Sequence, residues 1–455
     1  MEMVLEFLRD VLSQPALLIG IMSCVGLVAL KRPFHKVMTG TLKPILGYLM
    51  LAAGAGVIVS NLDPLGKMIE HGFHITGVVP NNEAIVAVAQ KVLGVETMSI
   101  LVVGLLMNLC IARFTKFKYV FLTGHHSLFM ACLMSAVLGT AGLSGMELIL
   151  VGGFLMGAWS AISPAIGQSY TSKVTDGDEI AIGHFGSLGY YLSAWVAQYV
   201  GKAEDSTEDI EIPEKWGFLR DSTLSTALTM IVFYLIAAIA AGSEFVSTLS
   251  GDMSPYLYAV MSAMNFAVGV TIVYSGVRMI LGDLIPAFQG IATKIIPNAI
   301  PAVDCAVFFT YAPTAVVLGF ISSFIGGIIG MLILGAVGGV LIIPGLVPHF
   351  FCGATAGIYG NATGGRRGAA VGAFLNGLAI TFLPALALPV LGQLGFQNTT
   401  FGDADFAVMG LVLGNAYEWV GMAGIYGIVA IAALVLIIPN FIKTKGKVIN
   451  YVEED

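Results

Sequence analysis

Three short polar groups stand inside otherwise apolar stretches of this chain, and their side chains are suited to binding a polar solute. The first group is Thr123-Gly124-His125-His126-Ser127. Imidazole and hydroxyl groups both donate and accept hydrogen bonds, so His125, His126 and Ser127 are candidates for holding a polyhydroxylated ligand. The alternative is that both histidines lie at the end of an apolar helix and extend to its surface. Neighbouring side chains point to different helix faces, which argues against a metal site at this pair.

The second group is Asp176-Gly177-Asp178-Glu179, which precedes Ile182-Gly183-His184-Phe185. Because the acids come just before an apolar segment, the pattern favours capping of a helix N-terminus. His184 lies deeper in that segment and is the better candidate for contact with a ligand.

The third group is a single carboxylate, Asp304, in the apolar run of residues 296–310. An isolated carboxylate in such surroundings is either protonated or holds a partner. The alternative is an N-cap for the helix that follows, since aspartate caps helices well. Both interpretations hold together if the capped helix end also faces a cavity.

The elements that position these groups are predicted to be transmembrane helices. Charged residues make up 11% and apolar residues 57% of the 455 positions, whereas soluble domains carry about 25% charged residues. A spanning helix needs about 20 apolar residues in a row. The sequence therefore predicts an all-α polytopic membrane protein with about eleven transmembrane helices, at 12–30, 41–62, 96–113, 119–141, 146–166, 222–242, 255–281, 306–330, 331–351, 368–392 and 419–442.

Basic residues predict the orientation and an acidic segment predicts the organisation. Lys31, Arg113 and Lys443 each follow a span, and the positive-inside rule places them in the cytoplasm, with the N-terminus outside. The segment 201–221 is predicted to be a cytoplasmic acidic linker between a first membrane repeat, 1–200, and a second repeat with a C-terminal span, 222–455. A faint recurrence of the pattern around Lys43 at Arg278 supports two repeats.

Four apolar segments are interrupted by polar, glycine or proline residues and suit re-entrant hairpins or interfacial amphipathic helices. Irregular backbone at membrane depth is tolerated only inside protein or along a wet cavity. These segments therefore predict such a cavity, and they are Ile75–Val92, Ile180–Val200, Leu284–Asp304 and Phe401–Val412.

Several classes of function are not indicated. The chain contains no Walker A loop, dinucleotide fingerprint or zinc-protease motif, and no sign of nucleic-acid binding. Its five cysteines form no C-x-x-C pair, so no metal site and no cofactor are expected. A voltage-sensor helix and a potassium-channel filter are also missing from the sequence.

The strings TLKPILGYLML, FLTGH, VTDG...IGH, SGVRMIL, AVDCAVFFTYAPTAVVLGF and LIIPGLVPHFF, in this order, resemble the membrane subunit (EIIC) of the ascorbate-type phosphotransferase system. The resemblance implies inverted repeats, a homodimer in a bacterial cytoplasmic (inner) membrane, and substrate and dimer-interface domains interleaved in sequence. It also implies uptake of L-ascorbate or a related sugar acid, which a separate EIIB protein phosphorylates from a phosphocysteine recharged by EIIA. This chain would then be the membrane component of a phosphoenolpyruvate-dependent phosphotransferase.

The resemblance assigns the T-G-H histidine to His125, the I-G-H histidine to His184 and the A-x-D-C carboxylate to Asp304. This chain departs from the family at four positions. Phe129 and Phe185 each stand where the family has glutamine, and Asn82-Glu83 stands where the family has a Thr-Tyr pair. Catalytic roles are expected for Asp304 and His184, through orientation of the hydroxyl that is phosphorylated. The expected substrate-binding residues are Ala55, Asn82, Glu83, His125, His126, Ser127, Phe129, His184, Phe185 and Asp304.

The same buried histidines and carboxylate also fit a proton- or sodium-coupled secondary transporter of an organic anion, which is the main alternative. A membrane-embedded enzyme without transport is a third possibility, although no catalytic motif favours it.

Overall fold

The structure is a computed structural model, and it describes residues 11, 14–74, 77, 78, 80, 82–210, 222–392 and 400–441. These residues are mostly helical, as predicted. The helices are α2 (Pro15–Ala29), α3 (Phe34–Phe73), α4 (Asn82–Phe114), α5 (Gly124–Thr140), α6 (Gly145–Thr175), α7 (Ser187–Val200), α8 (Ser222–Ala241), α9 (Ser243–Ser250), α10 (Pro255–Lys294), α11 (Pro313–Ala336), α12 (Leu346–Gly392), α13 (Ala404–Val420) and α14 (Met422–Phe441).

Seven of the described helices are long and apolar enough to cross a membrane, and eight do so if the bent pair α8–α9 is one span. The outer faces of these helices carry large apolar side chains, as contact with lipid requires, including Val232, Ile236 and Leu434. The chain is therefore a polytopic membrane protein, while the number eleven stays a prediction. The span predicted at 331–351 is wrong, because α11 ends at Ala336 and α12 begins only at Leu346.

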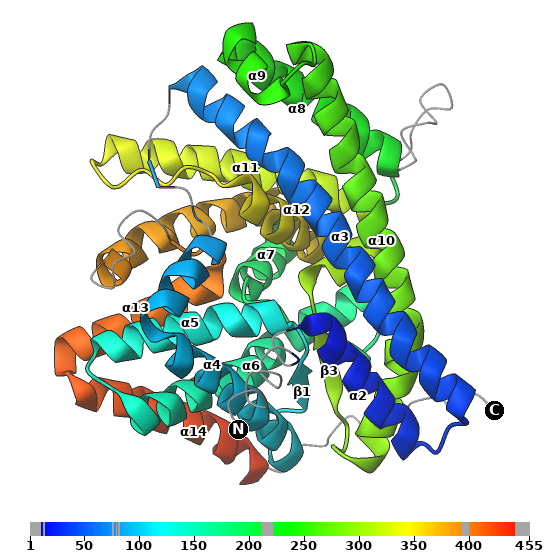
Figure 1. The fold of residues 1–455 in the computed structure, drawn as a ribbon, viewed down its shortest axis with the longest axis vertical. Coiled ribbons are helices and arrows are strands. Elements are labelled where there is room, and N and C mark those ends of the chain that lie inside the picture. Colours follow the sequence, from blue (N-terminus) through cyan, green and yellow to red (C-terminus); the bar gives the residue numbers. More distant parts are fainter. Residues whose placement is uncertain are drawn as a thin grey trace.

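The helices pack in two groups (Figure 1). One group, the frame, contains α2, α3, α8, α9 and α10. Its centre is the antiparallel crossing of α3 and α10, where a Cβ added to Gly47 would lie 2.8 Å from the carbonyl oxygen of Gly276. Glycine at this crossing lets the two backbones approach closely enough for extensive van der Waals contact. The second group, the site group, contains α4–α7 and α11–α14.

A small parallel sheet lies within the site group and was not predicted. Its strands are β1 (Tyr119–Phe121), β3 (Ile300–Val303) and β2 (Ala181–Ile182), with β3 in the middle. Tyr119 pairs with Ile300 and Ile182 pairs with Val303. Gly183 extends β2 by donating its N–H to the Val303 carbonyl oxygen at 2.7 Å.

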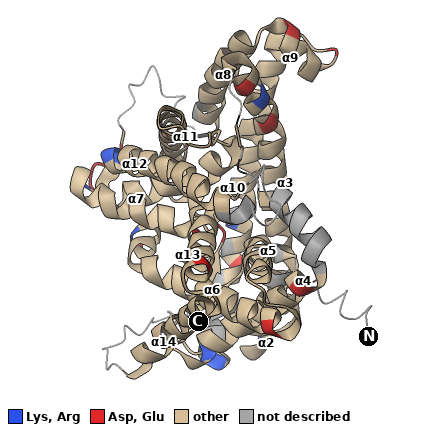
Figure 2. Cartoon of the chain, turned by 90° about the vertical axis from the view of Figure 1, so that its left-hand side faces the viewer, with Lys and Arg blue, Asp and Glu red and all other residues tan. Residues whose placement is uncertain are grey.

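Charged residues gather at helix ends and in connecting segments, which leaves the helix surfaces largely uncharged (Figure 2). The predicted N-cap role of the acidic run 176–179 is wrong. Asp176 ends α6 in a left-handed backbone conformation, and Asp178 accepts a hydrogen bond from the Ser172 hydroxyl. These acids precede β2 rather than a helix, so no N-terminus is available there for them to cap.

The described part of the acidic linker, 201–210, is packed against the site group. The Glu208 carboxylate accepts hydrogen bonds from the N–H groups of Thr314 and Ala315, at 3.0 and 3.1 Å. These N–H groups belong to the first turn of α11, where an anion is favoured by the helix dipole. Residues 211–221 and 442–455, which include the predicted basic C-terminal segment, lie outside the described residues.

Candidate functional site

A cavity of about 830 Å³ lies between the frame and the site group. This volume falls in the range of roughly 300–1,000 Å³ that is typical of small-molecule sites. Its lining follows α3 from Tyr48 to Glu70 and includes the segment before α12, with Asp63 and Lys67 exposed along it. The cavity therefore opens toward the C-terminal end of α3.

The deep end of the cavity lies at the carboxyl ends of the three short strands. His125 follows β1, His184 follows β2, and Asp304 follows β3 directly. Parallel strands end at one edge of their sheet, so residues far apart in the sequence converge there. The glycine of the I-G-H string is required by this packing, because a Cβ at Gly183 would lie 2.3 Å from the Ala302 carbonyl oxygen.

His125 and Asp304 form one side of the site. His125 Nε2 lies 3.5 Å from Asp304 Oδ2, and Nδ1 of the same ring lies 3.2 Å from the hydroxyl of Tyr48 on α3. Asp304 also caps the short 3₁₀ turn η2 (Cys305–Thr310), since its Oδ1 accepts from the Ala306 N–H at 3.0 Å. The predicted cap is thus confirmed, although it starts this turn rather than a membrane span. Asp304 also lines the cavity.

His126 and His184 form a second side, with their ring centroids 3.8 Å apart. The backbone N–H of Phe185 donates to His126 Nδ1 at 3.3 Å, and that of Gly186 donates to His184 Nδ1 at 3.2 Å. An N–H donor pairs only with an unprotonated ring nitrogen, so each neutral imidazole carries its hydrogen on Nε2. Both residues line the cavity, where two Nε2–H groups are suited to donate to ligand oxygens.

This tautomer assignment also decides how well the site fits a metal ion. Ligand atoms of His126, His184 and Asp403 lie within 4.8 Å of one another. A metal-bound histidine normally donates a hydrogen bond from its other ring nitrogen. Here the Nδ1 atom of each ring already accepts a backbone N–H, and at His184 this Nδ1 is the nitrogen that lies near Asp403. The arrangement therefore fits hydrogen bonding to a solute better than metal coordination.

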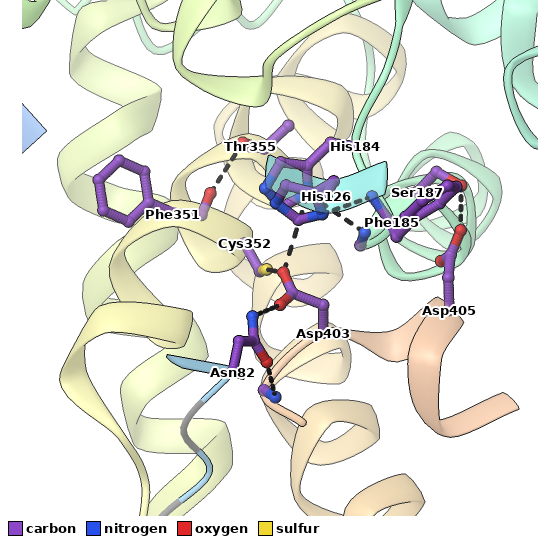
Figure 3. Close-up of polar contacts among 12 residues, drawn as sticks. Asn82, His126, His184, Phe185, Ser187, Phe351, Cys352, Thr355, Asp403 and Asp405 are labelled. Atoms are coloured by element: carbon purple, nitrogen blue, oxygen red, sulfur yellow. Dashed lines mark hydrogen bonds and ion pairs between the residues drawn. The ribbon is translucent and has the colours of Figure 1, made fainter. Parts of the chain in front are cut away.

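Asp403 was not singled out from the sequence, yet it joins four elements at the site (Figure 3). Its Oδ2 accepts from the Asn82 amide at 2.6 Å, and its Oδ1 accepts from the Cys352 thiol at 2.8 Å. His184 Nδ1 lies 3.8 Å from the same Oδ1. Asn82 also accepts from the Gly402 N–H at 2.9 Å, which fixes the start of α4 against the segment before α13.

Of the remaining predicted substrate-binding residues, the structure places some at the cavity and others away from it. Ala55, Asn82 and Phe129 line the cavity. Ser127 is fully buried and donates to the Thr123 carbonyl oxygen. Glu83 lies in α4, but its side chain is outside the described part of the structure.

Phe185 does not line the cavity. Its ring is fully buried and stacks on Phe121, with centroids 4.6 Å apart, and it contacts Phe406 edge-on. The predicted contact of Phe185 with the substrate is therefore not supported in this conformation. What Phe185 supplies to the site is its backbone N–H, which orients His126.

The alternative that both histidines of the first group are surface residues is wrong for His126, which is only 3% exposed. Its ring packs nearly parallel to Phe406, with centroids 5.6 Å apart. The His125 side chain is 37% exposed, but it faces the cavity rather than an outer surface. Both side chains thus belong to the site.

A cavity lined by histidine and aspartate side chains among apolar helices suits a membrane permease for a small solute, and comparison with known proteins agrees. The family model for sugar-specific permease components of the phosphotransferase system, EIIC-GAT, matches residues 10–405. The chain belongs to this family. The ascorbate-specific EIIC component of Mycoplasma pneumoniae is 26% identical to it, over 78% of this chain and 62% of that protein. The chain thus spans less than two thirds of the length of that relative.

Proposed function

We propose that this protein takes up L-ascorbate or a related sugar acid and presents it for phosphorylation by a separate EIIB protein. The observation that carries the proposal is the pair of imidazoles, His126 and His184, whose Nδ1 atoms accept backbone N–H groups and which line the same cavity as the Asp304 carboxylate. A flat sugar acid offers enolate and lactone oxygens to the two donors. Its hydroxyl groups donate to the carboxylate.

The phosphoryl transfer step assigns one role to Asp304. A substrate hydroxyl oxygen attacks the phosphorus of the EIIB phosphocysteine, the P–S bond breaks, and the thiolate leaves. Asp304 accepts a hydrogen bond from that hydroxyl and orients it, and the hydroxyl proton passes to the carboxylate and then to solvent. Such transfer depends mainly on positioning and electrostatic stabilisation, so EIIC need only present the oxygen correctly.

Movement of the site group against the frame is proposed to expose the cavity to each side in turn. The cavity opens toward the C-terminal end of α3, whereas Lys31 precedes the N-terminal end of this helix. With Lys31 in the cytoplasm, where the positive-inside rule places it, this conformation is open to the outside. Homodimer formation through the frame is part of the same proposal, and the exposed apolar face of α8 supports it.

The phenylalanines that replace family glutamines are expected to have different effects on selectivity. Phe129 lines the cavity beside His125, with ring centroids 5.8 Å apart, whereas Phe185 is buried behind His126. Phe129→Gln adds an amide to the cavity and is expected to change the relative affinity for sugar acids by about 10-fold, as one added hydrogen bond can. Phe185→Gln is expected to lower the melting temperature instead, because it buries an amide in an aromatic cluster.

These two variants are compared by isothermal titration calorimetry against L-ascorbate and other sugar acids, with thermal unfolding measured in parallel. An unchanged order of affinities in Phe129→Gln, together with a changed order in Phe185→Gln, contradicts this division of roles.

The substrate itself is tested by screening the purified wild-type protein against L-ascorbate, other sugar acids and neutral sugars by calorimetry. Saturable binding of a sugar acid, with neutral sugars at least about 10-fold weaker, supports the proposal. Preference for a neutral sugar overturns the substrate assignment. The secondary-transporter alternative predicts uptake in vesicles that follows a proton or sodium gradient and ignores phosphoenolpyruvate.

A further inference from the structure

The contacts between the frame and the site group are few and almost entirely apolar. They join α3 with α12, α10 with β3 and η2, α8 with α11, and α2 with α5. Rings also meet across this boundary: Phe233 of α8 packs against Phe320 of α11, and Phe266 of α10 packs against Phe350 of α12. Apolar contacts have no preferred direction, so they allow two packed surfaces to shift without leaving a polar group unpaired.

A directional contact crosses this boundary between residues that the structure describes. Within the described part of the chain, the bond between the Tyr48 hydroxyl and His125 Nδ1 is the single side-chain hydrogen bond between the frame and the site group. Tyr48 belongs to α3 and is 6% exposed, and it lines the cavity. Other polar contacts of α3, such as Lys43 with Asp283, stay within the frame.

The direction of this bond follows from its neighbours. His125 Nε2 faces the Asp304 carboxylate at 3.5 Å, and a carboxylate only accepts. The ring hydrogen is therefore on Nε2, so Nδ1 accepts from the Tyr48 hydroxyl. Tyr48, His125 and Asp304 thus form a chain of hydrogen-bonding groups from the frame to the η2 turn of the site group, where Asp304 accepts from Ala306.

We propose that the Tyr48–His125 hydrogen bond is a latch that holds the ligand-free protein with its cavity open toward the C-terminal end of α3. Both nitrogens of His125 are engaged, so a ligand that bonds this ring must displace Tyr48 or Asp304. Displacement of Tyr48 removes the directional contact and frees the site group to move. The ligand-driven step rests on the function proposed above, whereas the latch itself does not.

The test uses full-length protein in lipid vesicles and a cysteine at Val307 as reporter. Val307 lies in η2 and is 2% exposed. It lies beside Ile280 of α10, where the site group meets the frame. A cysteine there reacts with a maleimide only when the frame and the site group separate. Its reaction rate therefore reports the population of the separated state. The rate of the parent protein with its own five cysteines is subtracted.

Tyr48→Phe is expected to raise the reaction rate of Val307→Cys about 2- to 10-fold, the change in population that one hydrogen bond supplies. The matched control is Tyr234→Phe. Its hydroxyl donates to the Asn61 carbonyl oxygen on α3, but both residues belong to the frame. This control is expected to leave the rate unchanged. His125→Ala is expected to match Tyr48→Phe, and the double variant is expected to exceed neither, because both changes remove one shared bond.

Equal rates in Tyr48→Phe and Tyr234→Phe overturn the latch, and so does a double variant whose effect is the product of the two single effects. Saturating L-ascorbate is then added to the protein with Tyr48 intact. A rise toward the Tyr48→Phe rate supports ligand-driven release. If ascorbate has no effect while Tyr48→Phe still raises the rate, the latch stands and ligand-driven release is wrong, while the substrate is decided by the calorimetric screen.

Discussion

Asp304→Asn is expected to lower phosphoenolpyruvate-driven uptake at least about 100-fold, the usual effect of removing a group that orients or accepts a proton. The substitution separates the two roles of this residue. The amide oxygen of asparagine still accepts from the Ala306 N–H, so the cap of η2 is retained. What is lost is the charge that orients a substrate hydroxyl.

Uptake of labelled substrate is measured in membrane vesicles, per amount of protein that elutes as the folded species. Asp178→Asn is the matched control, because Asp178 accepts from Ser172 and does not line the cavity. Near-normal uptake in Asp304→Asn removes Asp304 from the mechanism. Loss of folded protein in Asp304→Asn alone makes its role structural.

His184→Asn is expected to fold like the parent protein and to lose substrate affinity about 10- to 100-fold, the value of a hydrogen bond to a charged ligand. The asparagine oxygen takes the place of Nδ1, which accepts from Gly186 N–H and lies 2.8 Å from the Tyr190 hydroxyl. The Nε2–H donor has no counterpart in asparagine. His184→Ala loses both features and is expected to lower the melting temperature as well.

Affinity is measured by calorimetry and stability by thermal unfolding in the same detergent. His349→Asn is the control, since His349 is also buried and its Nδ1 bonds to Ser323, but it does not line the cavity. It is expected to retain substrate affinity. If His184→Asn binds as tightly as the parent protein, the Nε2–H of this residue does not contact the substrate.

The class of fold was predictable because apolar runs need lipid, and the runs are long. The division of these runs into separate helices was harder to predict. The interval between α11 and α12 is apolar, so hydropathy alone predicted a helix through residues that are not helical, and Gly338 has the positive φ of a turn. The three strands were not predictable, because two to four residues carry no measurable alternation. They form only because three distant segments pair side by side.

The site was partly predictable for a physical reason. His125, His184 and Asp304 are costly in apolar surroundings, so the sequence marked them as candidates, and the structure brings them to one sheet edge. Asp403 carries the same signal within the interrupted segment Phe401–Val412 and was missed. Tyr48 carries no such signal, because a tyrosine in an apolar helix is common.

The measurement that tests the account most directly is the chemical state of substrate after uptake. Vesicles containing this protein are loaded with the soluble phosphotransferase proteins and phosphoenolpyruvate on the cytoplasmic side, which is the inside. Labelled L-ascorbate is then added outside. The account predicts that label accumulates inside as the phosphate ester, and that accumulation stops when phosphoenolpyruvate or EIIB is omitted. Accumulation of unmodified substrate that follows a proton or sodium gradient instead would contradict it.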